Sequence, residues 1–329
     1  MLMERILKDS SVLVTGGAGF IGSNLTESLL HSGNKVVCLD NFSTGKKKNI
    51  EAFLNNPKFK LIEGDIRNYD DCLKAAENID IVFHEAALGS VPRSIIDPVT
   101  STDVNIGGFV KMLFAAKESG IKRFIYAASS STYGDHPDLP KVEDKIGSPL
   151  SPYAITKYVD EMFAANFAKI YGIEVVGLRY FNVFGRRQDP DGAYAAVIPK
   201  FMKTLMKHEV PVINGDGSVS RDFTYIDNVI QANHLASVVQ NKSALNQVYN
   251  IAHGERTSLN QLFTFIRTFA AEFDKSLLTI EPVYGPARAG DIPHSLASIE
   301  KAKRLLFYSP AINVEVGLKE AVKWYWKNL

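Results

Sequence analysis

The sequence predicts an α/β protein in which a doubly wound parallel sheet carries a smaller α/β part. Short β-branched runs alternate with segments of helical periodicity up to Tyr180, and this alternation implies right-handed crossovers between parallel strands. The runs are almost continuously apolar, as expected of strands that are buried on both faces. After Tyr180 the alternation loosens and Gly and Pro become frequent, which indicates a second, less regular part.

The expected elements follow in order along the chain. The predicted strands are Ser11–Thr15, Lys35–Asp40, Phe59–Glu63, Asp80–His84, Arg123–Ala128 and Glu174–Tyr180. The predicted helices between them are Phe20–His31, Tyr69–Glu77, Pro98–Ser119 and Pro152–Tyr171. Beyond Tyr180 the spacing predicts helices over Ile198–Lys207, Asp227–Val239, Ser258–Ala271 and Val314–Lys327.

The composition is that of an ordinary globular protein of 329 residues, long enough for one large domain and a smaller companion. The formal net charge of +1 provides no field that would attract nucleic acid or an anionic membrane, so we expect neither partner. Cys38 and Cys72 allow no disulfide framework and lack metal-ligand spacing, so we expect buried thiols and no metal ion. Residues 1–10 do not read as a signal peptide and no apolar run reaches the length of a membrane span, so we expect a soluble cytoplasmic protein.

A glycine-rich turn follows the first predicted strand directly. Gly16, Gly19 and Gly22 let the chain turn tightly, let backbone N–H groups approach a pyrophosphate and let a helix pack on the strand. The second strand ends in Asp40, 18 residues after the last of these glycines, where its carboxylate can accept hydrogen bonds from an adenosine ribose. Because a 2′-phosphate would be repelled there, the pattern predicts NAD(H) rather than NADP(H). A glycine-rich turn without a ligand is the alternative, and we interpret Lys46–Lys48 as a solvated loop rather than a phosphate contact.

The spacing of these glycines, GxxGxxG, resembles the short-chain dehydrogenase/reductase superfamily. Glu85-Ala86-Ala87 after the fourth predicted strand and a DVNIGG stretch around Asn105, similar to the NVxGT motif of that family, carry the resemblance further. It implies that Asp65 and Ile66 contact adenine. The cofactor residues that it implies in these segments are Gly16, Gly19, Phe20, Ile21, Gly22, Asp40, Asn41, Ser43, Thr44, Gly45, Asp65, Ile66, Glu85, Ala86 and Asn105.

Tyr153 and Lys157 form a second pattern, in the segment SPYAITK. Their spacing of four at the start of a predicted helix places both on one face. A phenol with a pKa near 10 is a poor base at neutral pH, and lowering that value by about three units requires roughly 4 kcal/mol of phenolate stabilisation. A lysine one turn away, a positively charged nicotinamide and the helix N-terminus all act in that direction. A surface Tyr/Lys pair is the alternative interpretation.

Three serines follow the fifth predicted strand. Ser129, Ser130 and Ser131 lie at the carboxyl edge, where doubly wound sheets bind ligands. A hydroxyl group there can hydrogen-bond a reacting oxygen and pass on its proton. Serine runs also occur as plain turns, and the assignment among the three stays open, although the strand-end register favours Ser129. The succession of SSSTYG and SPYAITK supports the catalytic interpretation of Tyr153 and Lys157.

Together with LRYFNVFGRRQ, INGDG and an R-x-G-D segment, these motifs resemble the extended short-chain dehydrogenases that act on nucleotide-sugars. The resemblance covers essentially the whole chain and is closest to the UDP-N-acetylglucosamine 4-epimerase family, relatives of the UDP-galactose 4-epimerases. It implies a Rossmann-type NAD-binding domain of residues 1–180 and about 219–250, and a nucleotide-sugar-binding domain of residues 181–218 and 251–329. It also implies a homodimer formed through the helices 98–119 and 152–171, whose apolar residues could equally be monomer core.

The resemblance implies a role for each matching residue. Tyr153 would be the base, Lys157 would bind the nicotinamide ribose, and Tyr180 would support the nicotinamide, which adds these three to the cofactor residues. Arg221 and Arg288 would clamp the diphosphate, because guanidinium groups match phosphate oxygens, although either could be a surface ion pair. The substrate residues that the resemblance implies are Ser90, Ser129, Ser130, Tyr153, Asn182, Val197, Asn214, Arg221, Arg288, Asp291 and Ser295.

Particular residues separate the reactions that share this scaffold. In the dehydratases of the family an Asp-Glu pair follows the strand-edge hydroxyl, whereas Ser130 and Ser131 stand here. We therefore expect 4-epimerisation of a UDP-hexose through a transient 4-keto sugar with tightly bound NAD. Ser295 stands where members restricted to glucose and galactose have a tyrosine, which favours UDP-GlcNAc and UDP-GalNAc or their uronic acids. The alternatives are a UDP-glucose 4-epimerase, a UDP-uronate decarboxylase, a reductase that releases NAD(P), and a non-catalytic NAD-binding regulator.

Overall fold

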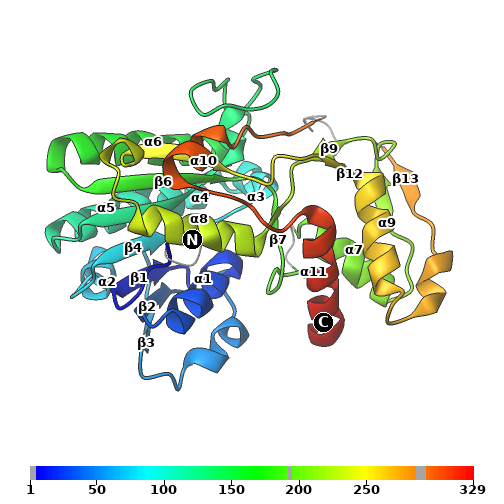
Figure 1. Ribbon diagram of the computed structural model, residues 1–329, viewed down its shortest axis with the longest axis horizontal. Coiled ribbons are helices and arrows are strands. Elements are labelled where there is room, and N and C mark those ends of the chain that lie inside the picture. The colour runs from blue at the N-terminus through cyan, green and yellow to red at the C-terminus, as the bar shows by residue number, and fades with distance from the viewer. Residues whose placement is uncertain (1–4, 192–194, 287–293) are drawn as a thin grey trace.

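The main body of the molecule is a parallel sheet with helices on both faces (Figure 1). The computed structural model describes residues 5–191, 195–286 and 294–329. Within these residues the main sheet has seven strands, all paired in parallel, in the order β11-β6-β5-β4-β1-β2-β3. The strands are β1 Ser11–Thr15, β2 Lys35–Asp40, β3 Phe59–Glu63, β4 Ile81–His84, β5 Arg123–Ser129, β6 Glu174–Tyr180 and β11 Gln247–Ile251.

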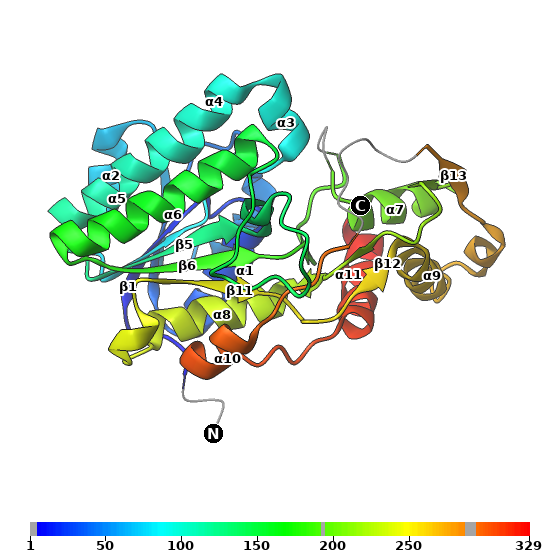
Figure 2. The ribbon, with the colours of Figure 1, turned by 90° about the horizontal axis from the view of Figure 1, so that it is seen from above.

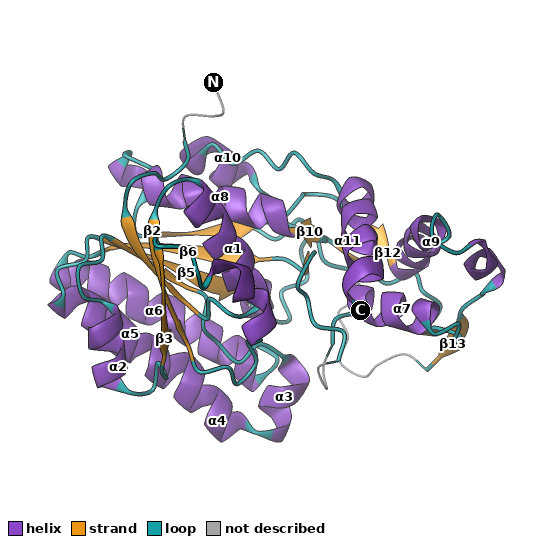
Figure 3. Ribbon diagram, turned by 90° about the horizontal axis from the view of Figure 1, so that it is seen from below, coloured by secondary structure: helices purple, strands orange, loops and turns teal. Residues whose placement is uncertain are grey.

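Each face of the sheet has its own helices (Figure 3). One layer holds α2 Tyr69–Ala75, α5 Phe109–Glu118 and α6 Pro152–Tyr171, and the other holds α1 Phe20–His31, α8 Ile226–Val238 and α10 Glu300–Leu306. Side chains of a strand point alternately to the two faces, and β1 divides accordingly: Val12 and Val14 belong to one core cluster and Leu13 to the other. This double burial explains why the strands read as continuous apolar runs.

The six predicted strands are confirmed, with small differences at their ends. β4 begins at Ile81 rather than Asp80, and β5 continues to Ser129. The sheet also contains β11, which the sequence analysis did not predict. Gln247 and Asn250 interrupt its apolar run, and pairing with β6 makes it a strand. Asn250 is buried there because its side chain bonds to Lys141, Ser298 and Tyr133.

The prediction of one helix over Pro98–Ser119 was wrong. The segment is α4 Pro98–Thr102, a π-helical turn Asp103–Gly108 and then α5. Two contacts account for the irregular turn. The Asn105 side chain is held by Leu88 and Thr156, and a Cβ on Gly108 would lie 2.5 Å from Ile66 Cδ1, so a larger residue there would displace the Ile66 side chain. The extra residue of a π turn places both contacts without ending the helical path.

The remaining elements form a smaller part beside the sheet (Figure 2). It contains α7 Val197–Met206, α9 Leu259–Ala270 and α11 Val314–Asn328, so three of the predicted helices are confirmed to within one residue at either end. Short strands pair there: β8 Val212–Asn214 with β13 Val283–Gly285, and β9 Ser220–Arg221 with β12 Thr257–Ser258. β7 Val183–Phe184 pairs with β10 Thr224–Tyr225. Between α9 and α11 the chain returns to the sheet, where α10 packs on β11 and α8. The division of the chain into an NAD-binding domain and a nucleotide-sugar-binding domain stays a prediction.

Apolar side chains are exposed on the helices where the resemblance placed a dimer contact. Val99 of α4 is 77% exposed and Met162 of α6 is 56% exposed; Ile96 of the preceding helix α3 Val91–Ile96, which lies outside those two segments, is 73% exposed. The homodimer itself stays a prediction.

Both cysteines are free and buried, as expected. Of the helices in the described residues, none is long and apolar enough to cross a membrane.

Candidate active site

The glycine loop connects β1 to α1 and forms the wall of a cavity of about 260 Å³, here called the glycine-loop cavity. Gly16 has a φ of +67°, and a Cβ there would lie 2.8 Å from the Ala86 backbone. A Cβ on Gly22 would lie 2.1 Å from the Gly16 carbonyl oxygen, so the loop closes tightly only with glycine. The predicted cofactor residues that line the cavity are Gly16, Gly19, Phe20, Ile21, Gly22, Asp40, Asn41, Ser43, Thr44, Ile66, Glu85 and Ala86.

Asp40 lies at the edge of this cavity, at the end of β2. Its two carboxylate oxygens accept backbone hydrogen bonds from Ala18 (2.9 Å) and Phe42 (2.8 Å). Burial raises the pKa of Asp40, and the two N–H donors act against that rise. A Cβ on Gly45 would lie 2.9 Å from Asp40 Oδ1, so glycine at this position leaves room for the carboxylate; its contact with the cofactor stays a prediction.

Five other predicted cofactor residues are not among those that line the glycine-loop cavity, namely Asp65, Asn105, Tyr153, Lys157 and Tyr180. Asp65 accepts hydrogen bonds from Arg67 and Asn41, and the Arg67 guanidinium lowers the pKa of Asp65 to about 2. Asn105 accepts a hydrogen bond from Leu88 N (2.8 Å) and donates to Thr156 Oγ1 (3.1 Å). Asn105 therefore ties a wall of the cavity to α6, which is a positioning contact.

The predicted catalytic pair lies in the first turns of α6. Ser151 caps this helix by accepting a hydrogen bond from Ala154 N, and Pro152 follows at the first helical position. The backbone N–H of Tyr153 donates to Ser94 Oγ at 3.0 Å, which fixes the turn to α3. Lys157 is 2% exposed, and its ammonium group donates to the Ala127 carbonyl oxygen (3.0 Å) and to the Asp160 carboxylate (3.3 Å).

Tyr180 belongs to a buried chain of hydrogen bonds that reaches the glycine-loop cavity. Its hydroxyl donates to Glu85 Oε1 (2.9 Å) and accepts from Asn233 Nδ2 (2.9 Å). Burial raises the pKa of Glu85 to about 7, and the Tyr180 hydroxyl and the Lys157 charge act against that rise. Glu85 Oε2 has no partner among the described residues. The first turn of α1, whose N–H groups have no partner within the helix, lines the same cavity and suits the pyrophosphate of a bound dinucleotide.

The serines after β5 divide between two environments. Ser129 is 8% exposed, and its Oγ accepts hydrogen bonds from the Ser131 backbone N–H and hydroxyl. Ser130 and Ser131 line a second cavity of about 590 Å³, here called the serine cavity. The predicted residues Asn182, Arg221 and Ser295 also line it, together with Lys141 and His294, which the sequence analysis did not select. Its volume is sufficient for a sugar ring.

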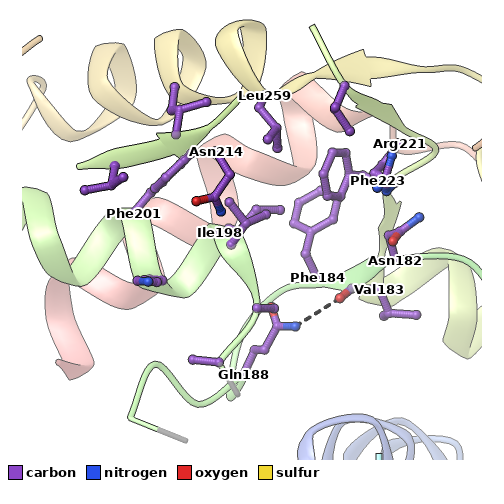
Figure 4. A pocket seen from close by; sticks show the side chains of 17 residues that line it. Asn182, Val183, Phe184, Gln188, Ile198, Phe201, Asn214, Arg221, Phe223 and Leu259 are labelled. Carbon is purple, nitrogen blue, oxygen red and sulfur yellow. Dashed lines mark hydrogen bonds between the residues drawn. The ribbon is translucent and has the colours of Figure 1, made fainter. Parts of the chain in front are cut away.

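A third cavity of about 300 Å³, the aromatic cavity, is a neighbour of the serine cavity, because Asn182 and Arg221 line both. Figure 4 shows Phe201 and Phe223 at its wall, with Asn214 and Arg221 as polar groups. The predicted residues Val197 and Asn214 line it. An apolar wall with a few polar groups suits a base and its phosphates. The lining residues that the sequence analysis missed are Val183, Phe184, Gln188, Ala195, Ala196, Ile198, Lys200, Phe201, Val212, Ile213, Val219, Phe223 and Leu259.

Three predicted substrate residues fall elsewhere. Ser90 caps α3, with its Oγ accepting a hydrogen bond from Arg93 N, and it is the apolar residues of α3 that line the serine cavity. Arg288 and Asp291 lie outside the described residues. Ser295, the second described residue after that gap, is fixed by a hydrogen bond from its N–H to the Ser220 carbonyl oxygen at 3.1 Å.

The fold and the site together define an NAD-binding enzyme of the extended short-chain dehydrogenase class. The chain belongs to the NAD dependent epimerase/dehydratase family, whose model matches residues 12–252, and NAD is its cofactor. It is similar to the solved UDP-N-acetylglucosamine 4-epimerase of Methanobrevibacter ruminantium in complex with UDP-N-acetylmuramic acid, with a TM-score of 0.89, 39% identity and coverage of 98% of this chain and 100% of that one.

Two further relatives widen the range of reactions. A putative UDP-glucose 4-epimerase of Methanocaldococcus jannaschii is 36% identical over 96% of this chain and 99% of its own length. A UDP-N-acetyl-alpha-D-glucosaminuronate decarboxylase of Bacillus cytotoxicus is 31% identical over 95% of this chain and 97% of its own. The relatives therefore share a UDP-sugar substrate but differ in the sugar and in the reaction.

Proposed function

We propose that this protein is a UDP-N-acetylhexosamine 4-epimerase, acting on UDP-GlcNAc and UDP-GalNAc or their uronic acids. The observation that carries the proposal is that the serine cavity and the aromatic cavity lie next to each other, with Asn182 and Arg221 in the walls of both. A nucleotide-sugar laid along both would place its uridine among the aromatic side chains, its diphosphate near Arg221 and its hexose against Ser130 and Ser131. Ser295, a small residue, lines the hexose end and leaves room there.

In this proposal Tyr153, as its phenolate, removes the proton of the C4 hydroxyl and later returns it. The glycine loop and Asp40 would hold NAD in the glycine-loop cavity, where the cofactor would supply hydride acceptor and hydride donor chemistry for C4. The serines at the end of β5 form hydrogen bonds to the reacting oxygen at C4 and orient it for proton transfer. Between the two hydride transfers the 4-keto sugar rotates, so that its opposite face receives the hydride. Lys157 stabilises the phenolate by its charge. The Ser151 cap and the Ser94 contact hold the Tyr153 backbone in place before substrate arrives.

A panel of UDP-sugars tests the proposal. We expect purified protein, without added cofactor, to interconvert UDP-GlcNAc and UDP-GalNAc or the two corresponding uronic acids, because the hydride is returned in every cycle. Proton NMR of the sugar ring measures the C4 configuration directly. Loss of carbon dioxide from the uronic acids would identify a decarboxylase instead. Inversion only of UDP-glucose and UDP-galactose would contradict the proposed sugar, and inertness towards all of them would favour an NAD-binding regulator.

A further inference from the structure

A buried carboxyl group lies beside the predicted catalytic residue Lys157. Asp160 is fully buried one turn after Lys157 on α6, and its Oδ2 is 3.3 Å from the Lys157 ammonium nitrogen. An ammonium group has three N–H donors. Among the described residues, the Ala127 carbonyl oxygen and Asp160 accept two of them. These two acceptors hold the Lys157 ammonium group between α6 and β5.

The other acidic groups near Lys157 are already engaged. Glu161, the next residue of α6, forms a two-pronged ion pair with Arg179 of β6 at 2.8 and 2.7 Å. Glu85 accepts the Tyr180 hydroxyl. Asp160 is thus the carboxylate that the described structure pairs with the catalytic lysine.

The remaining titratable neighbours do not compete for this role. Burial lowers the pKa of His84, at the end of β4, to about 3, so its ring is neutral. Burial raises the pKa of Tyr126, on β5, well above the ordinary range, so its phenol is neutral too.

Asp160 Oδ1 is buried and accepts no hydrogen bond from the described residues. Burial raises the pKa of Asp160 to about 7, and the Lys157 charge acts against that rise.

We propose that Asp160 is the counter-ion of Lys157 and that the negative charge of Asp160 weakens the stabilisation of the Tyr153 phenolate by Lys157. The inference rests on the proposed function, since it needs Tyr153 as the base. The Lys157 charge favours the phenolate, whereas a carboxylate beside the lysine opposes that effect. Asp160 is a positioning residue: it acts through Lys157. Removal of its negative charge makes the phenolate form at lower pH.

The test is the pH dependence of kcat for the NAD-containing enzyme, in the direction from UDP-GlcNAc, in wild type and Asp160→Asn. Asparagine keeps the size and an acceptor for Lys157 but removes the charge. Seven residues along a helix span about 10 Å, and a unit charge at that distance shifts an ionisation by roughly one pH unit at an effective dielectric constant of about 20. The acid limb of the pH profile is the range in which kcat falls as the pH is lowered. We expect the midpoint of this limb to lie at a pH lower by about one unit in Asp160→Asn than in wild type.

Two further variants make the test independent of folding defects. Asp160→Ser removes the same charge with a smaller side chain and should shift the limb in the same direction. Glu161→Gln is the matched control, because Glu161 is the neighbouring buried carboxylate but pairs with Arg179. We expect it to lower the melting temperature while leaving the midpoint of the limb in place. A merely structural role for Asp160 would reduce activity at every pH without moving the midpoint.

A second readout does not depend on turnover. The phenolate absorbance of Tyr153 is obtained by subtracting the pH titration of Tyr153→Phe from that of the parent, with and without Asp160→Asn. A downward shift of this midpoint supports the inference, and an unchanged or raised midpoint in both Asp160 variants overturns it. If wild-type enzyme interconverts no UDP-sugar, the proposed function fails, and the absorbance midpoint still decides the role of Asp160.

Discussion

Replacement of Tyr153 by phenylalanine will abolish turnover and leave NAD bound. The substitution keeps the aromatic ring and the backbone hydrogen bond from residue 153 to Ser94, so the start of α6 keeps its structure. It removes the oxygen that takes the C4 hydroxyl proton, and loss of a general base lowers rates by about 10²- to 10⁴-fold. The measurements are kcat by NMR and the NAD content of the purified variant.

Tyr158→Phe is the matched control for that experiment. Tyr158 lies on the same helix, one turn and a half further on, and also loses only a hydroxyl group. We expect it to retain activity within a few-fold of wild type. Activity of Tyr153→Phe at the level of this control would remove Tyr153 from the mechanism, and loss of NAD from the Tyr153 variant alone would give it a binding role instead.

Replacement of Ser295 by tyrosine should exclude acetylated sugars. The Ser295 backbone is held on Ser220 at 3.1 Å, so a new side chain cannot easily move away from the serine cavity that it lines. Asp222 reinforces this position by accepting a hydrogen bond from Ala297 N. A phenol ring would occupy the space that an N-acetyl group at C2 needs, and we expect kcat/KM for UDP-GlcNAc to fall on the order of 100-fold or more, as steric overpacking of several kcal/mol implies.

The plain sugars provide the internal control for Ser295→Tyr. UDP-glucose and UDP-galactose lack the acetyl group, so their turnover should persist in the variant and the specificity ratio should invert. Ser295→Ala keeps the space and removes only the hydroxyl, and it should preserve the preference for acetylated sugars. Undiminished UDP-GlcNAc turnover by Ser295→Tyr would place the acetyl group elsewhere in the cavity.

The glycine loop and its cavity could be predicted because their constraints are local. Gly16 and Gly22 stand where any Cβ would collide with backbone, and Asp40 ends the neighbouring strand. These constraints follow from short stretches of sequence around single strand ends. Asn105 shows the limit of that approach: its motif was recognised, but its side chain supports Leu88 and Thr156 and is not among the residues that line the cavity.

The sugar side could be predicted only in part because it is assembled from distant segments. Phe201 comes from α7, Phe223 from the stretch between β9 and β10, and Leu259 from the start of α9. Each reads in the sequence as an ordinary core residue, and only tertiary packing brings the three together. The same reason applies to Asn233 and Asp160, which lie on regular helices and gain their roles from contacts with Tyr180 and Lys157.

In the proposed reaction, hydride leaves C4 of a UDP-sugar and returns to C4 within one binding cycle. UDP-GlcNAc carrying deuterium at C4, incubated with the purified protein and an excess of unlabelled NADH, tests this return of the hydride. We expect UDP-GalNAc that retains deuterium at C4, with none in the added cofactor. Product with hydrogen at C4, or deuterium in the NADH pool, would rule out the proposed reaction.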